Sequence, residues 1–148
     1  MAGKKLNGTD VLLSIWNGAA VPAAWQPIAS LTEQSLERTA NEIDVTGKED
    51  GGSSASLVGR KERTISFSGY AIAVPAVGKI GFDYLENLFD NSIEFEWRIA
   101  PVSGAEYTPR FGFGVLLSLN ETASDNEGVQ FDANLKVNGT PVKVNPHV

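Results

Sequence analysis

The sequence predicts a mainly β domain, an antiparallel β-sandwich or barrel with one α-helix on its flank. Apolar and polar residues alternate with a period of two through most of the chain, which is typical of strands with one buried and one wet face. Only one segment, from about Lys79 to Phe89, has apolar residues at helical spacing. Runs of antiparallel strands with a single helix favour a sheet that closes or packs on itself.

The chain has 148 residues and is expected to form a single domain, residues 1–148. A domain of this size buries about 70 % of its unfolded surface and needs no cross-links to be stable. The sequence contains no cysteine, which excludes disulfides, thiolate metal sites and a cysteine nucleophile. Residues 1–8 and 141–148 are interpreted as extended arms. In the C-terminal arm, Pro141 and Pro146 cannot donate ladder hydrogen bonds.

The first half of the chain contains the less regular strands. One is expected from Val11 to Trp16. Another runs from Ile28 to Thr39, and its alternation slips phase near Ser35, as a β-bulge would cause. A more regular strand is expected at Arg63–Tyr70.

Three strands of the second half have a clear apolar line. The lines are Ile93, Phe95, Trp97 and Ile99; Phe111, Phe113, Val115, Leu117 and Leu119; and Val129, Phe131, Ala133, Leu135 and Val137. Opposite the middle line the residues are mostly Gly and Ser, which predicts a wet face there. On the expected helix the apolar side consists of Ile80, Tyr84, Leu85, Leu88 and Phe89. These lines predict the core.

A long connection separates the β-type run Glu42–Thr46 from the strand at Arg63. It extends from Gly47 to Gly59, and connections this long are usually functional or disordered. The residues expected to act in it are Gly47, Lys48, Glu49, Asp50, Gly51, Gly52, Ser53, Ser54, Leu57, Val58 and Gly59. Its small residues allow close backbone approach, and Leu57 with Val58 supplies an apolar anchor. The segment therefore predicts an arm by which subunits grip one another.

The charge distribution argues against a conventional DNA-binding protein. The formal net charge is -6, and the carboxylates are spread along the chain. Tight binding of a phosphate backbone needs clustered Lys and Arg, whereas the only basic cluster here is Gly59–Arg63. The sequence also has no apolar run of the ~18 residues that a membrane span needs.

Candidate catalytic and metal-binding residues are few. The only histidine, His147, lies near the end of an arm where we expect no surrounding pocket, which disfavours histidine-dependent catalysis. Glu94 and Glu96 share a strand face with a spacing compatible with glycoside hydrolysis, although solvated carboxylates explain them more simply. The acidic segments at residues 49–52 and 125–128 lack EF-hand spacing. We expect no catalytic residue, no cofactor and no metal site.

A carbohydrate-binding β-sandwich is the alternative function from another class. It requires an exposed aromatic platform, for which Trp25 is the candidate. Trp97 falls in the apolar phase of its strand and is expected in the core.

Several segments, taken in order, resemble the major tail tube proteins of long-tailed bacteriophages and related gene transfer agents. The similar segments are Lys5–Leu13, Ser35–Arg38, Glu42–Lys48, Gly51–Gly52, Leu57-x-Gly59 and Thr64–Gly69. The helix before a charged strand also fits, so the resemblance spans nearly the whole chain. The Ile-Asp-Val-Thr element before the Gly-rich loop contributes most to it.

The resemblance implies a structural subunit that forms hexameric rings, which stack into a tail tube and conduct DNA into the host. It implies that the connection 47–59 reaches a neighbouring subunit or ring, and that the terminal arms assist. The candidate lumen-facing residues are Thr64, Ser66, Ser68, Gln130, Asp132 and Asn134. Implied partners are further copies of the chain, the tail terminator, tail tip and tape-measure proteins, and DNA in non-specific passage. The implied location is the virion tail, after assembly in the host cytoplasm.

Overall fold

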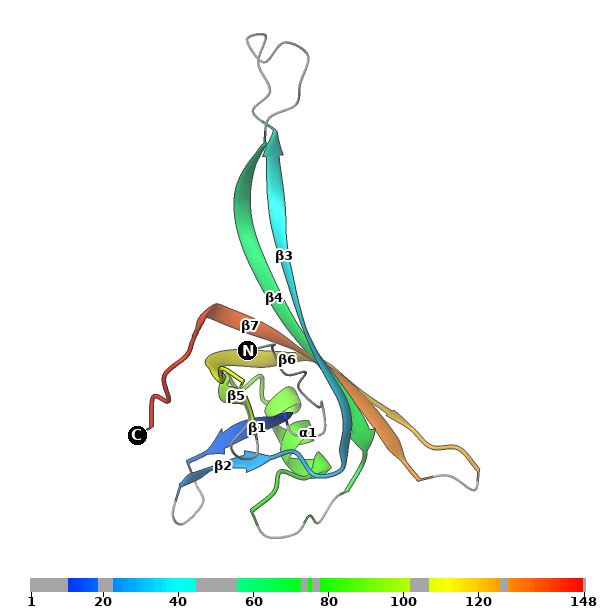
Figure 1. The fold of residues 1–148 in the computed structure, drawn as a ribbon. Coiled ribbons are helices and arrows are strands. Elements are labelled where there is room, and N and C mark those ends of the chain that lie inside the picture. Colours follow the sequence, from blue (N-terminus) through cyan, green and yellow to red (C-terminus); the bar gives the residue numbers. More distant parts are fainter. Residues whose placement is uncertain are drawn as a thin grey trace, which may run out of the picture.

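In the part of the chain that the structure describes, seven strands form one antiparallel sheet (Figure 1). The computed structural model describes residues 11–18, 23–44, 56–72, 75, 78–101, 107–125 and 128–147. The elements are β1 (Val11–Asn17), β2 (Ala24–Pro27), β3 (Leu31–Asp44), β4 (Ser56–Tyr70), α1 (Phe82–Asp90), β5 (Phe95–Pro101), β6 (Arg110–Thr122) and β7 (Gln130–Val142). The strand order is β2-β1-β5-β6-β7-β4-β3. The predicted fold class, mainly antiparallel β with one helix, is confirmed.

The sheet curls until its two ends meet at Gln34. Gln34 lies on the edge strand β3, and its side-chain oxygen accepts a hydrogen bond from the Leu13 N–H at 2.8 Å. Its amide nitrogen donates to the Val11 carbonyl at 3.4 Å. Because β1 pairs with β2 only from Ser14 onward, the first residues of β1 have no strand neighbour on this side. The Gln34 amide replaces that neighbour and joins the two ends of the sheet.

One side of the curled sheet packs on α1 to form the hydrophobic core. The buried apolar residues of the core cluster are Leu13, Ile15, Ile28, Ile65, Phe67, Ile80, Leu85, Leu88, Phe95, Trp97, Ile99, Leu116, Phe131, Ala133, Leu135 and Val137. The apolar lines predicted for the strands at residues 95–99 and 131–137 are confirmed by this burial.

The helix begins later than predicted, at Phe82 instead of Lys79. Ile80 forms a parallel bridge with Ile28, and its N–H donates to the Pro27 carbonyl at 2.9 Å. Those backbone groups are therefore already used in strand-like pairing, which delays the first helical turn. The helix buries Leu85 and Leu88 but leaves Phe89 39 % exposed, so the prediction that Phe89 is a core residue was wrong.

The apolar line predicted for β6 was wrong at Phe113 and Leu117, although Phe111 is buried. Trp97 and Phe95 of β5 pair with Gly112 and Gly114, which places these glycines on the core face. A Cβ on Gly112 would lie 2.8 Å from Cζ2 of Trp97, so the indole occupies the space that a side chain would need. Phe113 and Leu117, predicted in the core, are 47 % and 59 % exposed. A bulge between Leu116 and Ser118 then changes the phase.

Several predicted strand boundaries also require correction. The strand expected from Ile28 to Thr39 begins at Leu31 and continues to Asp44, with irregularities at Leu31/Glu33 and Ala40/Glu42 and no register shift at Ser35. At the first irregularity the backbone of Ser30 lies very close to Gly69. A Cβ on Gly69 would be 2.3 Å from the Ser30 carbonyl oxygen. β5 begins at Phe95, and Ile93, after the turn at Ser92 (φ 50), is 39 % exposed instead of buried.

The connection predicted at residues 47–59 and the C-terminal arm predicted at residues 141–148 are both shorter than expected. β4 begins at Ser56, so Leu57, Val58 and Gly59 belong to this strand and not to the connection; Leu57 and Val58 pair with β3, and Gly59 lies at the irregularity opposite Ala40/Glu42. β7 extends to Val142 and takes in Pro141, because Val142 still pairs with Phe111. Residues 1–8, and 47–54 of the predicted connection, lie outside the described residues.

Candidate functional site

The six candidate lumen-facing residues lie together on one face of two adjacent strands. In the register of β4 and β7, Ser66 is opposite Asn134 and Ser68 is opposite Asp132. Thr64 and Gln130 follow at alternate positions of the same strands, on the same face. The core side chains Ile65, Phe67, Phe131, Ala133 and Leu135 project from the opposite face. The structure thus gathers all six on the side of the sheet that faces away from the core.

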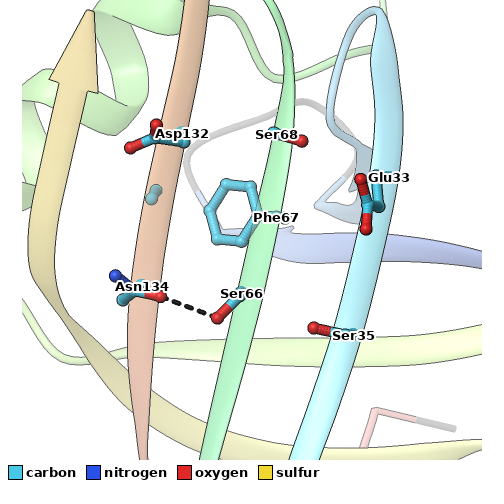
Figure 2. Close-up of a pocket in the computed structure, with 8 residues that line it drawn as sticks. Glu33, Ser35, Ser66, Phe67, Ser68, Asp132 and Asn134 are labelled. Carbon is cyan, nitrogen blue, oxygen red and sulfur yellow. Dashed lines mark hydrogen bonds between the residues drawn. The ribbon is translucent and has the colours of Figure 1, made fainter.

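Hydrogen bonds between side chains link three strands of this face. Ser66 Oγ donates to Asn134 Oδ1 at 2.7 Å, as Figure 2 shows, and Asn134 Nδ2 donates to Ser118 Oγ at 2.9 Å. One step along, Asn120 Nδ2 donates to Asp132 Oδ1 at 2.9 Å. We call this set the polar ladder. It orients polar groups that a solvated strand would leave free to rotate.

Ser118 and Asn120 belong to the polar ladder but were not among the predicted residues. The β6 bulge at Leu116/Ser118 brings them onto this face opposite Asn134 and Asp132. The sequence carries no periodic signal for the bulge, because the apolar residues from Phe111 to Leu119 keep one phase and only Leu116 interrupts the small and polar positions between them.

Carboxylates extend the polar face onto β3. Glu33 is opposite Ser68, Ser35 is opposite Ser66, and Glu37 is opposite Thr64. A groove of about 340 Å³ lies between the strands, lined by Glu33, Ser35, Ser66, Phe67, Ser68, Asp132, Ala133 and Asn134 (Figure 2). The cation nearest to it on β7, Lys136, is paired with Glu62 at 3.6 Å. This face of β3, β4 and β7 carries four carboxylates (Glu33, Glu37, Glu62 and Asp132) and two cations (Arg60 and Lys136), which makes it acidic.

The β3–β4 hairpin projects well beyond the rest of the molecule (Figure 1). Near its far end Ile43 and Leu57 are opposite each other and are 49 % and 57 % exposed. Val58, the next residue, is 68 % exposed. The two predicted anchor residues, Leu57 and Val58, therefore lie on a paired strand and present apolar side chains to solvent.

A cluster of aromatic residues lies where the C-terminal segment returns to the sheet. The His147 ring stacks on Trp16 with centroids 3.7 Å apart and planes 2° apart, and its Nε2 is 2.6 Å from Glu96 Oε2. Trp25 contacts Trp16 edge-on and donates from Nε1 to Asn145 Oδ1 at 3.2 Å. The expectation that His147 has no surroundings was wrong, because the segment folds back onto β1, β2 and β5.

The contacts of the C-terminal segment with the sheet bear on the two alternative functions, carbohydrate binding and glycoside hydrolysis. One face of Trp16 is covered by His147 and the indole N–H of Trp25 is bonded to Asn145, which removes the aromatic platform that a sugar would need. Trp97 is buried, as predicted, and donates from Nε1 to the Phe113 carbonyl at 3.1 Å. Of the two candidate glycosidase carboxylates, Glu96 contacts His147 and Glu94 accepts a hydrogen bond from Asn138 at 2.9 Å.

The described residues contain no group of three histidine or carboxylate side chains that could hold a metal ion. Of the acidic loops considered for Ca²⁺, residues 49–52, 126 and 127 lie outside the described residues. None of the helices that the structure describes has the length and apolar character required to cross a membrane.

Comparison with known proteins identifies the family. The family model described as phage tail tube protein matches residues 5–143. The chain belongs to this family. It is a structural tail tube protein, and thus a component of the virion tail. No curated protein matches it.

Solved structures share the fold of this tail tube protein. A subunit from the tail of an empty gene transfer agent particle with C6 symmetry has a TM-score of 0.78 at 19 % identity, over 95 % of this chain and 100 % of that one. The SPP1 tail tube has a TM-score of 0.69 at 16 % identity, over 91 % of this chain and 77 % of that one. A chain from the anti-feeding prophage baseplate has a TM-score of 0.65 at 9 % identity, over 96 % of this chain and 97 % of that one.

Proposed function

We propose that this tail tube protein assembles into six-membered rings that stack into a hollow tube, with the acidic face of β3, β4 and β7 lining the lumen. The observation that carries the proposal is this continuous polar face, linked by the polar ladder and backed by the hydrophobic core. The solved gene transfer agent tail of the same fold has six-fold symmetry, which supports a ring of six.

The sheet edges supply a physical reason to assemble. β2 and β3 are the terminal strands of the sheet, and β3 is 14 residues long. A long free edge exposes unpaired backbone groups and invites uncontrolled pairing, which a closed ring prevents. Heterologous contacts that close within a ring and repeat along its axis generate a tube. The exposed Ile43, Leu57 and Val58 would then be covered by neighbouring copies.

An acidic lumen suits a DNA conduit. The DNA duplex carries about one negative charge per 1.7 Å of its axis, and a basic wall would hold it through many phosphate contacts. Carboxylates, amides and hydroxyls offer no such contacts. At physiological salt the repulsion acts within about 8 Å of the wall, so it keeps the duplex off the surface without blocking passage. We propose that the subunit performs no catalysis and that DNA moves through the tube by sliding.

The tube is proposed to join tail terminator, tail tip and tape-measure proteins at its ends and in its lumen. Assembly would take place in the host cytoplasm before the particle is complete.

Negative-stain electron microscopy across a concentration series, alongside sedimentation, tests the proposal. Rings or hollow tubes with six-fold rotational symmetry are the expected result, either alone or after addition of a tail-tip initiator that supplies the first ring. A protein that remains monomeric at every concentration and in the presence of the initiator would contradict it. A symmetry other than six would retain the tube but overturn the hexamer.

A further inference from the structure

The side of the β3–β4 hairpin that faces away from the polar ladder carries a group of basic side chains. Arg38 is directly opposite Arg63, and Lys61, opposite Ala40, is the next residue on this side toward the tip. We call Arg38, Lys61 and Arg63 the basic stripe. Like charges directly opposite each other destabilise a sheet, so the hairpin gains nothing by itself from this arrangement.

The chain does not neutralise the basic stripe within its described part. None of the three side chains forms an ion pair there, and the acidic residues further along the same side are Glu42, opposite Val58, and Asp44, opposite Ser56. Three cations thus lie on the same side as two carboxylates, on a hairpin that projects beyond the rest of the molecule (Figure 1). An anionic partner would relieve the repulsion between Arg38 and Arg63.

The helix α1 presents the complementary charge. Asp83, Glu86 and Asp90 follow each other at spacings of three and four residues, so they share one side of the helix, and all three are exposed. We call them the acidic stripe. Glu86 and Asp90 repel each other, and Asp90 lies in the last turn, where a carboxylate is unfavourable and where the helix has no basic residue. The apolar side chains of Phe89 and Ile93 next to the stripe are each 39 % exposed.

The two stripes belong to the same layer of the molecule but cannot meet within one chain. Leu85 and Leu88 pack α1 on the side of the sheet that carries Ile65. Arg63 projects from that same side, because it is two residues from Ile65 on the same strand. The hairpin, however, points away from the body that contains α1 (Figure 1). A second copy placed along the hairpin would bring its helix layer against the basic stripe.

The basic stripe and the acidic stripe have similar lengths. Two residues of a strand span about 7 Å, so Arg63 to Lys61 covers about 7 Å and the stripe with Val58 beyond it roughly twice that. Seven residues of helix from Asp83 to Asp90 span about 10 Å. Val58, 68 % exposed beyond Lys61, is then positioned to contact Phe89 or Ile93 of the other copy.

We infer that the basic stripe of one subunit docks on the acidic stripe of α1 in a second copy of this chain. The contact is heterologous, since each copy offers its hairpin to one neighbour and its helix to another. The inference rests on the proposed tube assembly and specifies which surfaces meet in it. The lumen wall then remains polar and acidic, while the cationic side of the hairpin is covered by protein.

Charge reversal provides the first test. Arg38→Glu with Arg63→Glu, and separately Asp83→Arg with Glu86→Arg, are each expected to raise the concentration needed for tube formation by about tenfold or more. The combination of all four substitutions restores assembly, because the pairs re-form with opposite sign. Thermal unfolding of each monomer shows that the fold is intact, and Glu121→Lys and Lys143→Glu serve as charge-reversal controls away from both stripes.

Cross-linking provides a test that does not depend on disrupting assembly. The chain has no cysteine, so Lys61→Cys and Glu86→Cys proteins introduce single thiols without background. Mixed and oxidised during assembly, they should form a disulfide between copies, whereas Lys61→Cys with Glu121→Cys should not.

The outcomes separate the inference from the proposed function. Suppose that the wild-type protein forms tubes. Normal assembly of both charge-reversed variants would then overturn the pairing of the two stripes but not the tube, and so would the absence of both rescue in the combined variant and the cross-link. Failure of the wild-type protein to form rings or tubes in the presence of the initiator overturns both.

Discussion

At the scale of single residues, Gln34 has a role that its exposed strand does not suggest. Its side chain makes two hydrogen bonds to the backbone of β1, at 2.8 and 3.4 Å, and so joins the two ends of the curled sheet. Glutamine suits this position because its amide carries a donor and an acceptor, as a peptide group does.

Replacing this amide by an apolar side chain of similar size should destabilise the fold. In Gln34→Leu the Leu13 N–H loses its partner in a partly buried place, which costs about 1–3 kcal/mol. Chemical denaturation of the monomer measures the loss. Gln130→Leu, at an exposed position, is the matched control, and equal stability of the two variants would contradict the role of Gln34.

Gly112 is the second residue whose role depends on a partner strand. The Gly112→Ala substitution would place a Cβ 2.8 Å from the Trp97 ring, so we expect overpacking to cost about 1–3 kcal/mol. Gly18→Ala is the control, because its Cβ would lie at an ordinary 3.6 Å from Trp16. Thermal unfolding compares the two, and an unchanged stability of Gly112→Ala would show that Trp97 can move aside.

At the scale of elements, the C-terminal segment is held to the sheet by a few side chains. His147 stacks on Trp16 and contacts Glu96, while Asn145 accepts hydrogen bonds from Trp25 Nε1 and from the His147 N–H at 3.2 and 2.9 Å. No long ladder holds this segment, because β7 ends at Val142. Its attachment therefore depends on this cluster.

Removing the imidazole should release the segment and leave the core intact. In His147→Ala the ring of Trp16 loses its stacked neighbour and becomes more exposed to water, so tryptophan emission should shift to longer wavelength. Trp97 is buried and does not contribute to the shift. Val144→Ala, at a side chain that is 77 % exposed, is the control. An identical spectrum for the two variants would mean that the ring does not hold the segment.

In the β3–β4 hairpin, strand pairing extends well beyond the hydrophobic core. Its two strands remain paired from Leu31 opposite Gly69 to Asp44 opposite Ser56, although the far half packs on no core. Isolated two-stranded hairpins are only marginally stable in water. We therefore expect covering by neighbouring copies to stabilise the far half, which is consistent with the exposed Ile43 and Leu57.

At the scale of the whole molecule, charge is divided between the two sides of the sheet. The proposed lumen side carries Glu33, Glu37, Glu62 and Asp132 against Arg60 and Lys136. The other side of the hairpin carries Arg38, Lys61 and Arg63 against Glu42 and Asp44. The net charge of -6, a sum over the whole chain, does not reveal this division. The proposed tube needs the division, because an acidic lumen releases DNA while the cationic side binds protein.

Reversing charge in the lumen should convert a conduit into a DNA-binding tube. Tubes assembled from Glu33→Lys with Asp132→Lys are expected to retain short duplex DNA at low salt and to release it as salt rises, because phosphate contacts exchange with counterions. Filter binding of labelled DNA to purified tubes measures this. Glu121→Lys with Asp125→Lys changes the net charge equally, and equal retention by both kinds of tube would contradict the lumen assignment.

The sequence by itself determined the fold class, the helix near residues 82–90 and the polar faces of β4 and β7. These depend on alternation within a single strand or helix, which is local and does not need a partner. The same alternation placed Ile65, Phe67, Phe131, Ala133 and Leu135 correctly in the core. The tail tube resemblance rested on such local segments in order, and the family match confirms it.

Only the tertiary structure decided those features that depend on contact between two segments distant in the sequence. The phase of β6 is set by Trp97, which fills the space beside Gly112 and turns two glycines toward the core. The start of β4 at Ser56 depends on its pairing with Asp44, and the docking of His147 depends on Trp16 and Glu96. A side chain's partner far along the chain leaves no periodic trace in the sequence, because the fold brings it close only after the strands have paired.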